Sequence, residues 1–129
     1  MHTELKKIGI RPSIQRMAVM DFLMKNPIHP TIDEIYSGLN QTMPTLSKTT
    51  VYNTVKTLSD SRAIQTIFID EKNKRYDANT DNHAHFMCVT CGKIIDLPIK
   101  SIGIEVENSE NLAVTEFHLY YRGHCENCK

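Results

Sequence analysis

Four cysteines near the carboxyl end of this 129-residue chain share one spacing. Cys88 and Cys91 form a CxxC pair, and Cys125 and Cys128 form a second pair after 33 intervening residues. Each pair can hold two thiolates on a tight turn, and two such turns complete the tetrahedral sulfur cage that Zn(II) prefers. Because four sulfur ligands leave no open position on the ion, the spacing predicts a structural zinc site.

Two other chemistries are open to these cysteines. Two disulfides would fit a secreted protein, but the sequence carries no secretory signal. A redox-active pair of the thioredoxin kind needs a single CxxC at the start of a helix, whereas this chain has two matched pairs. Both alternatives explain the pattern less well than zinc does.

A second group of metal donors surrounds His83 and His85. Their imidazoles are expected on one face of a strand, because side chains alternate along a strand. Asp77 precedes them by six residues, and Asp96 ends the expected strand 92–96. Histidine nitrogens with carboxylate oxygens suit Fe(II), Mn(II) or Zn(II), and a mixed set of more than four ligands favours the first two.

Two alternatives use these residues differently. The His83-Ala84-His85 pattern also fits an ordinary surface strand, with both aspartates in turns. Two histidines and one carboxylate are also the ligands of a non-haem iron oxygenase, although such an enzyme would leave the amino-terminal half without a role.

The formal charge is zero overall but divided along the chain, with 15 Lys and Arg against 15 Asp and Glu. Residues 1–80 carry 11 basic and 8 acidic side chains (+3), and residues 81–129 carry 4 and 7 (−3). Neutrality argues against a simple cationic nucleic-acid binder, but the division predicts a basic domain 1–77, a polar hinge 78–82 and a ligand-rich domain 83–129. No apolar run approaches the roughly 20 residues of a membrane span, so we expect a cytoplasmic protein.

The amino-terminal half predicts three short helices and a β-hairpin. Each helix starts at a side chain that can cap its first turn, namely Ser13, Thr31 and Ser47. In the first helix, 13–26, the four-residue spacing places Ile14, Ala18 and Phe22 on the buried face. Strands expected over 63–69 and 75–77 complete a winged helix-turn-helix.

The third helix, 48–59, has an outward face suited to double-stranded DNA. Lys48 and Lys56 can reach phosphates, Thr49 and Asn53 can meet base edges, and the Tyr52 ring can pack on a thymine methyl. A solvated helix face with one amphipathic tyrosine is the alternative.

The carboxyl-terminal half predicts a small α/β domain with a helix over 101–111 and a strand over 112–121. Its 47 residues bury too little apolar surface alone, so zinc and a partner chain are expected to stabilise it. The whole chain is therefore expected to be an α+β protein, a winged helix followed by a dimerisation domain, that forms a homodimer.

Seven short motifs run in order from about residue 6 to Cys128: Arg11–Arg16 (RPSIQR), His29–Thr31 (HPT), Thr50–Asn53 (TVYN), Arg75–Asp77 (RYD), His83–His85 (HAH), Cys88–Lys93 (CVTCGK) and Cys125–Cys128 (CENC). Together they resemble the ferric uptake regulator (Fur) family of metal-dependent repressors, and most closely its peroxide-responsive (PerR) branch. The resemblance implies a structural zinc on the four cysteines and a regulatory Fe(II) or Mn(II) bound by His29, Asp77, His83, His85 and Asp96. It also implies that Arg11 enters the minor groove and that Tyr52 contacts a base.

The same resemblance implies a mechanism. The regulatory metal joins the two domains so that the homodimer fits a palindromic operator, and peroxide releases the DNA by oxidising His29 or His83 through bound iron. Each molecule reacts once, which makes it a sensor with no catalytic residues. A reversible Fe(II)-responsive iron-uptake regulator is the alternative, although Asp96 favours the peroxide-responsive branch because iron-uptake regulators tend to carry Glu there. His118 and His124 stay open as donors of a further metal site.

Overall fold

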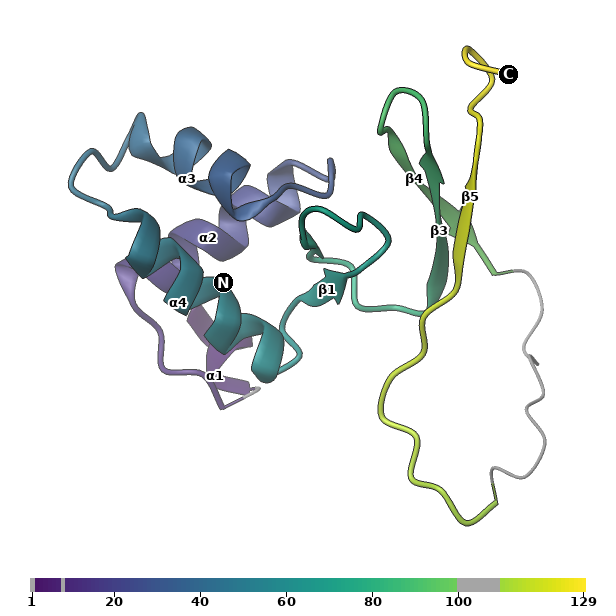
Figure 1. Cartoon of the computed structure of the whole chain (residues 1–129). Helices are drawn as coiled ribbons and strands as arrows, with labels where there is room; N and C mark the ends of the chain where they lie inside the picture. The colour runs from purple at the N-terminus through teal and green to yellow at the C-terminus, as the bar shows by residue number, and fades with distance from the viewer. Residues whose placement is uncertain (1, 8, 100–109) are drawn as a thin grey trace. The chain divides into compact units, whose positions relative to one another are not determined.

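The structure, a computed structural model, describes residues 2–7, 9–99 and 110–129, which form two compact units, 1–80 and 81–129 (Figure 1). The first unit contains four helices and a hairpin: α1 His2–Lys7, α2 Ile14–Lys25, α3 Ile32–Asn40, α4 Lys48–Asp60, β1 Gln65–Ile67 and β2 Arg75–Asp77. The second contains β3 His83–Cys88, β4 Ile94–Pro98 and β5 Tyr120–Gly123. None of the helices in the described ranges is long and apolar enough to cross a membrane. The α+β fold class is thus confirmed.

The three expected helix caps are present. Ser13 accepts a hydrogen bond from the Arg16 backbone amide at 3.1 Å, and Ser47 accepts one from Thr50 at 3.1 Å. At the start of α3, Thr31 and Glu34 form the complete capping box. Each cap satisfies a backbone N–H that the first turn of a helix leaves without an acceptor, so these short segments begin where the sequence predicts.

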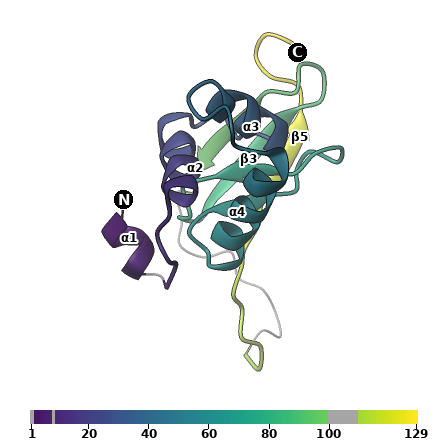
Figure 2. The same ribbon diagram turned by 90° about the vertical axis from the view of Figure 1, so that its left-hand side faces the viewer.

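Helices α2, α3 and α4 lie side by side around one apolar core (Figure 2). Helix α4 contributes Val51, Val55 and Leu58, all at most 1% exposed, as its spacing predicts. The opposite face of α4 is thereby directed to solvent.

The predicted buried face of α2 is wrong at Ile14 and confirmed in part at Ala18 and Phe22, which pack against the core. Val19 and Leu23 are buried, whereas Ile14 is 71% exposed and Ala18 and Phe22 are only partly buried. The sequence of α2, IQRMAVMDFLMK, has apolar residues on every side, so a four-residue spacing can be drawn in several phases. Packing against α3 and α4 selects the phase.

Strands β1 and β2 form the expected antiparallel hairpin, in which Gln65 stands opposite Asp77. The strands are short, and the loop 68–74 between them forms the wing. The three helices α2–α4 with this hairpin make a winged helix-turn-helix.

The second unit is a three-stranded sheet of order β4-β3-β5. Strands β3 and β4 are antiparallel and are joined through the first CxxC turn, whereas β5 runs parallel to β3. The strand predicted over 112–121 is wrong in extent, because only its last two residues belong to β5. Because His85 pairs with Tyr120 in a parallel register, residue 118 lies opposite His83, the first residue of β3. Residues before 118 would therefore lie beyond the start of β3, where they have no strand to pair with. The predicted helix 101–111 falls outside the described residues except for the turn at 110–111.

Candidate metal centres and nucleic-acid interface

The four cysteines converge at one end of the β3–β5 sheet. Their sulfur atoms all lie within 4.8 Å of one another, and Cys91 Sγ lies 3.8 Å from Cys125 Sγ. None of these four cysteines is joined in a disulfide. A tetrahedral zinc with Zn–S bonds of about 2.3 Å has sulfur–sulfur edges of about 3.8 Å. The cage therefore fits zinc, and a disulfide explanation of the cysteines is wrong.

Backbone amides prepare Cys88 as a thiolate. Hydrogen bonds from the amides of Cys91 and then Cys125 lower the pKa of Cys88 to about 5, and the Cys91 N–H lies 3.5 Å from Cys88 Sγ. Hydrogen bonds of its thiol with Cys125 and Cys88 raise the pKa of Cys128 to about 12. Because zinc binds only thiolates, Cys88 is ready for the ion at neutral pH and Cys128 must release a proton.

The two HxH imidazoles meet one carboxylate in the second unit. His83 and His85 lie on one face of β3, with ring centroids 4.3 Å apart. Asp96, which pairs with His85 across β3 and β4, has Oδ1 3.2 Å from Nε2 of each histidine. Adjacent ligand atoms on one ion with bonds of about 2.1 Å lie about 3 Å apart. Each histidine nitrogen therefore lies at the distance from Asp96 Oδ1 that separates neighbouring ligands of one cation.

The other nitrogen of His83 is already engaged. Its Nδ1 lies 2.6 Å from the carbonyl oxygen of Asp81, to which it donates as an N–H. This hydrogen bond fixes the tautomer whose Nε2 carries the lone pair, and Nε2 is the atom that faces Asp96. Such an outer hydrogen bond is the usual support of a metal-binding histidine.

The first unit contributes a second facing pair. His29 Nε2 lies 3.5 Å from Asp77 Oδ2, and both side chains are buried. His29 has φ = +55° although it precedes Pro30, a position that favours extended backbone. A conformation of this kind costs about 1–3 kcal/mol and persists at functional positions. No local pattern in the sequence points to His29, and the family resemblance alone indicated it.

The remaining two histidines of the second unit have other partners. His118 lies between Glu116, 3.4 Å from its Nε2, and Tyr120, whose hydroxyl is 3.1 Å from its Nδ1. His124 Nδ1 lies 3.0 Å from Thr90 Oγ1, which links the two CxxC turns directly. In the described parts of the chain, neither histidine belongs to a cluster of three or more metal donors.

The outward face of α4 is exposed along its length. All five predicted DNA-contacting side chains, Lys48, Thr49, Tyr52, Asn53 and Lys56, are exposed, and so is Arg11. A groove of about 550 Å³ separates this face from the wing and is lined by Lys48, Tyr52, Lys72 and Lys74. Its three lysines suit the phosphates of a nucleic-acid backbone.

The two lysines on the outward face of α4 have acidic neighbours. Lys48 pairs with Asp33 at the start of α3. Lys56 pairs with Asp60 at 3.0 Å, and this hydrogen bond raises the pKa of Lys56. Exposed pairs of this kind are weak, so a phosphate can replace either carboxylate at little expense.

Comparison with known proteins decides the family. The model of the ferric uptake regulator family matches residues 7–122. The chain belongs to the ferric uptake regulator family. The resemblance drawn from its motifs is thus confirmed, and membership in a family of regulators accounts for a chain that combines a winged helix with two sets of metal donors.

Individual family members agree. The peroxide-responsive repressor PerR of Staphylococcus epidermidis is 35% identical, over 97% of this chain and 85% of that protein. The peroxide stress regulator of Campylobacter jejuni has a similar structure, with a TM-score of 0.72 and 27% identity over 98% of this chain and 94% of the other. The ferric uptake regulator Fur of Helicobacter pylori shares the fold, with a TM-score of 0.73 and 24% identity over 98% and 87% of the two chains. Family relatives therefore include both peroxide and iron regulators.

Proposed function

We propose that this protein is a metal-dependent DNA-binding repressor whose regulatory metal takes ligands from both units. The donor geometry carries the proposal. His29 and Asp77 face one another in residues 1–80, and Asp96 faces His83 and His85 in residues 81–129. Neither subset alone supplies the five or six ligands that Fe(II) and Mn(II) commonly take, whereas together they offer three nitrogens and two carboxylates.

An ion shared by the two subsets would restrain the hinge. The first unit carries the recognition helix α4, and in a homodimer the restraint would fix the separation of the two recognition helices. This separation would match the half-sites of a palindromic operator. The free energy of metal binding would then appear as DNA affinity.

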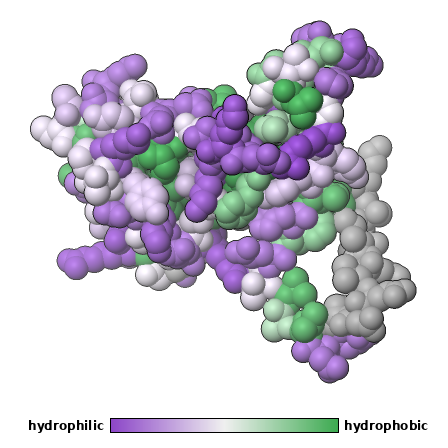
Figure 3. All heavy atoms as spheres, viewed as in Figure 1, coloured by the Kyte–Doolittle hydropathy of each residue, from purple (hydrophilic) through white to green (hydrophobic). Residues whose placement is uncertain are grey.

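The second unit offers a surface for the homodimer. Hydrophobic side chains lie exposed on the segment that precedes β5 (Figure 3), including Leu112, 66% exposed, and Val114, 71% exposed. Tyr121 on β5 is 52% exposed. Apolar side chains gathered on a small unit are typical of a contact with another chain, and a second copy would cover them.

The peroxide-responsive relatives support hydrogen peroxide as the signal. When bound, Fe(II) would supply the reducing electrons that cleave peroxide. His29 and His83 are the side chains we expect to gain oxygen, as the resemblance implies. An oxidised imidazole binds metal poorly, so the hinge would be released and the DNA freed. Because each molecule is consumed in one reaction, the protein is a sensor and not an enzyme.

A comparison of two metals tests this function. DNA that binds the Mn(II)-loaded protein is first selected from a random duplex pool, and the protein is then loaded with Fe(II) or Mn(II) and exposed to equal peroxide. We expect one added oxygen on the His29 or His83 peptide and loss of DNA binding in the iron form alone, with the His124 peptide unmodified.

Other outcomes assign other functions. DNA release on chelation with unmodified histidines after peroxide would identify a reversible Fe(II)-responsive regulator. DNA binding that does not depend on metal would contradict the repressor mechanism altogether. Repeated turnover of an organic substrate without DNA binding would indicate an oxygenase.

A further inference from the structure

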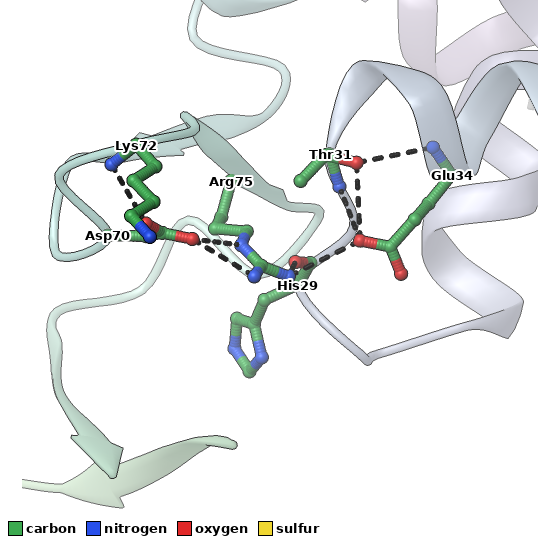
Figure 4. A network of polar contacts seen from close by, with 6 residues as sticks. All are labelled: His29, Thr31, Glu34, Asp70, Lys72 and Arg75. Carbon is green, nitrogen blue, oxygen red and sulfur yellow. Dashed lines mark hydrogen bonds and ion pairs between the residues drawn. The ribbon is translucent and has the colours of Figure 1, made fainter. Parts of the chain in front are cut away.

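Arg75 lies at the centre of a polar network in the first unit (Figure 4). Its Nη1 donates to the carbonyl oxygen of His29 at 3.3 Å and to Glu34 Oε1 at 3.3 Å. Its Nε and Nη2 donate to Asp70 Oδ2 at 3.2 Å and 3.0 Å. One guanidinium thus joins the wing to two neighbouring parts of the chain more than 40 residues away, the loop before α3 and the first turn of α3.

Strand β2 holds His29 from two sides. Arg75 and Asp77 are two residues apart on this strand and share one face. Arg75 contacts the carbonyl oxygen of His29, and Asp77 lies 3.5 Å from its imidazole. Between them, the Tyr76 amide donates to the Pro30 carbonyl at 3.1 Å. These contacts maintain the positive φ of His29, which an isolated chain would rarely adopt.

The network continues into the turn of the wing. Asp70 Oδ1 accepts a hydrogen bond from the Lys72 backbone amide at 2.9 Å, while Oδ2 of the same carboxylate receives Arg75. Lys72 and Lys74 then line the groove opposite α4. Arg75 therefore bonds both the carbonyl oxygen of His29 and the Asp70 carboxylate, which shapes the turn that faces α4 across the groove.

We propose that Arg75 is a positioning residue that couples metal binding at His29 and Asp77 to the turn 70–74 of the wing. This inference rests on the proposed function and adds a route inside the DNA-binding unit to the restraint of the hinge. An ion bound by His29 and Asp77 would hold in place the two residues next to Arg75: His29, whose carbonyl oxygen Arg75 contacts, and Asp77, two residues further along β2. Because the guanidinium is rigid and planar, it would in turn restrain the Asp70 carboxylate and the turn that this carboxylate shapes. Lys72 and Lys74 would then be held in positions from which they can contact DNA phosphates.

The fork of Arg75 is the part that lysine lacks. An ammonium group is a point charge without the planar set of five donors, and it cannot bond three acceptors in these directions. The Arg75→Lys variant therefore keeps the charge and the strand and removes the connection. Glu34→Gln is the matched control, because glutamine also serves in a capping box and leaves the His29–Arg75–Asp70 route intact.

The first measurement is the ratio of DNA affinities with Mn(II) and after chelation, on a duplex selected by the wild-type protein. We expect Arg75→Lys to lower this ratio by about 2- to 30-fold, the range found for substitutions within coupling networks, and Glu34→Gln to preserve it. Zinc content and circular dichroism should match the wild type. An equal loss of affinity with and without metal would leave the ratio unchanged and overturn the coupling.

A second measurement does not need DNA. Amide hydrogen exchange of residues 70–74 is followed with and without Mn(II), and binding of the ion is checked by electron paramagnetic resonance. We expect bound metal to slow exchange of the wing in the wild type and not in Arg75→Lys. Should that variant fail to fold, Asp70→Asn takes its place, because its amide oxygen still accepts the Lys72 N–H and the charged partner of Arg75 is gone.

The outcomes separate this inference from the proposed function. Wild-type protein that gains DNA affinity with metal while wing exchange is unaffected keeps the repressor function and refutes the Arg75 route. Wild-type protein whose DNA affinity is independent of metal refutes both.

Discussion

Asp96 Oδ1 lies 3.2 Å from Nε2 of His85, its register partner across strands β3 and β4. The same oxygen lies 3.2 Å from Nε2 of His83. Three donors thus meet on one face of a sheet whose backbone pairing holds them in place. A site built on paired strands changes little when an ion arrives, which favours affinity.

Asp96→Ala should therefore weaken the regulatory site alone. Without the Asp96 carboxylate we expect Mn(II) affinity to fall by at least about 10-fold, because substitution of a residue that only supports a metal ligand already costs about this much. Titration of Mn(II) by electron paramagnetic resonance measures the change, and zinc content should remain at the wild-type level. Leu97→Ala, a change at the neighbouring and 36% exposed residue of β4, is the control. Unchanged Mn(II) affinity in Asp96→Ala would remove this carboxylate from the site.

Cys125→Ser should remove zinc and destabilise the second unit. Cys125 is buried, and the cage fastens the end of β5 to the turn after β3 more strongly than the Val89–Gly123 backbone hydrogen bond and the His124–Thr90 contact can. Structural zinc supplies folding free energy directly, so we expect a loss of several kcal/mol and a separate, earlier thermal transition. Metal analysis and differential scanning calorimetry measure the two effects. Val89→Ala, within the first CxxC turn but 54% exposed, should retain both zinc and stability.

Features fixed by neighbouring residues could be predicted from the sequence, and those fixed by distant contacts could not. The caps Ser13, Thr31 and Ser47 act within one turn, and each CxxC pair acts within one knuckle. By contrast, the buried face of α2 depends on which side meets α3 and α4. The start of β5 depends on where β3 begins. Local patterns contain neither kind of information.

The polar network of Arg75 shows the same limit at the candidate site. Its acceptors lie 5, 41 and 46 residues away in sequence, and no spacing motif joins them. The alternation of Arg75 and Asp77 on one strand was the single available signal. The proposed role of His29 likewise depends on a backbone conformation that no residue type at this position predicts.

Lys48→Ala should weaken DNA binding through charge. If Lys48 contacts one phosphate, its loss removes about one released counterion, so the slope of log affinity against log salt should fall by about 1. The effect should be similar on selected and random duplexes. Lys25→Ala is a matched control, because Lys25 is also exposed and also paired, with Asp21 at 3.0 Å, but lies on α2. An unchanged slope in Lys48→Ala would show that Lys48 does not contact a DNA phosphate.

Asp70 makes the wing network sensitive to acid. The Lys72 amide, and then Arg75, lower the pKa of Asp70 below its ordinary value of 3.8. A carboxyl whose pKa is lower in the folded state stabilises the fold above its unfolded pKa, and this stabilisation is lost as pH falls through the folded pKa. Stability should therefore decline below about pH 4 more steeply in the wild type than in Asp70→Asn. Urea unfolding at a series of pH values measures both curves, and parallel curves would contradict the assignment.

Gly38→Ala should destabilise the DNA-binding unit even though alanine is the better helix former. A methyl group on Gly38 of α3 would lie 2.7 Å from Cζ of Phe22 on α2, and closer still to Cε2. Alanine gains about 1 kcal/mol in an exposed helix, but overpacking a core contact costs about 1–3 kcal/mol. We expect a net loss in urea unfolding, whereas Ser37→Ala, at the exposed neighbouring position, should be neutral or slightly stabilising.

The double variant decides whether the ring of Phe22 is the cause. Phe22→Leu alone loses packing, but it removes the ring atoms that an alanine at residue 38 would meet. In combination, Gly38→Ala should then show its helix-forming benefit, so that the two changes are coupled rather than additive. Strict additivity would mean that α3 shifts away from α2 instead. Such a shift would also move the capping box of α3 and the loop that carries His29, and it would be detected as weaker Mn(II) binding.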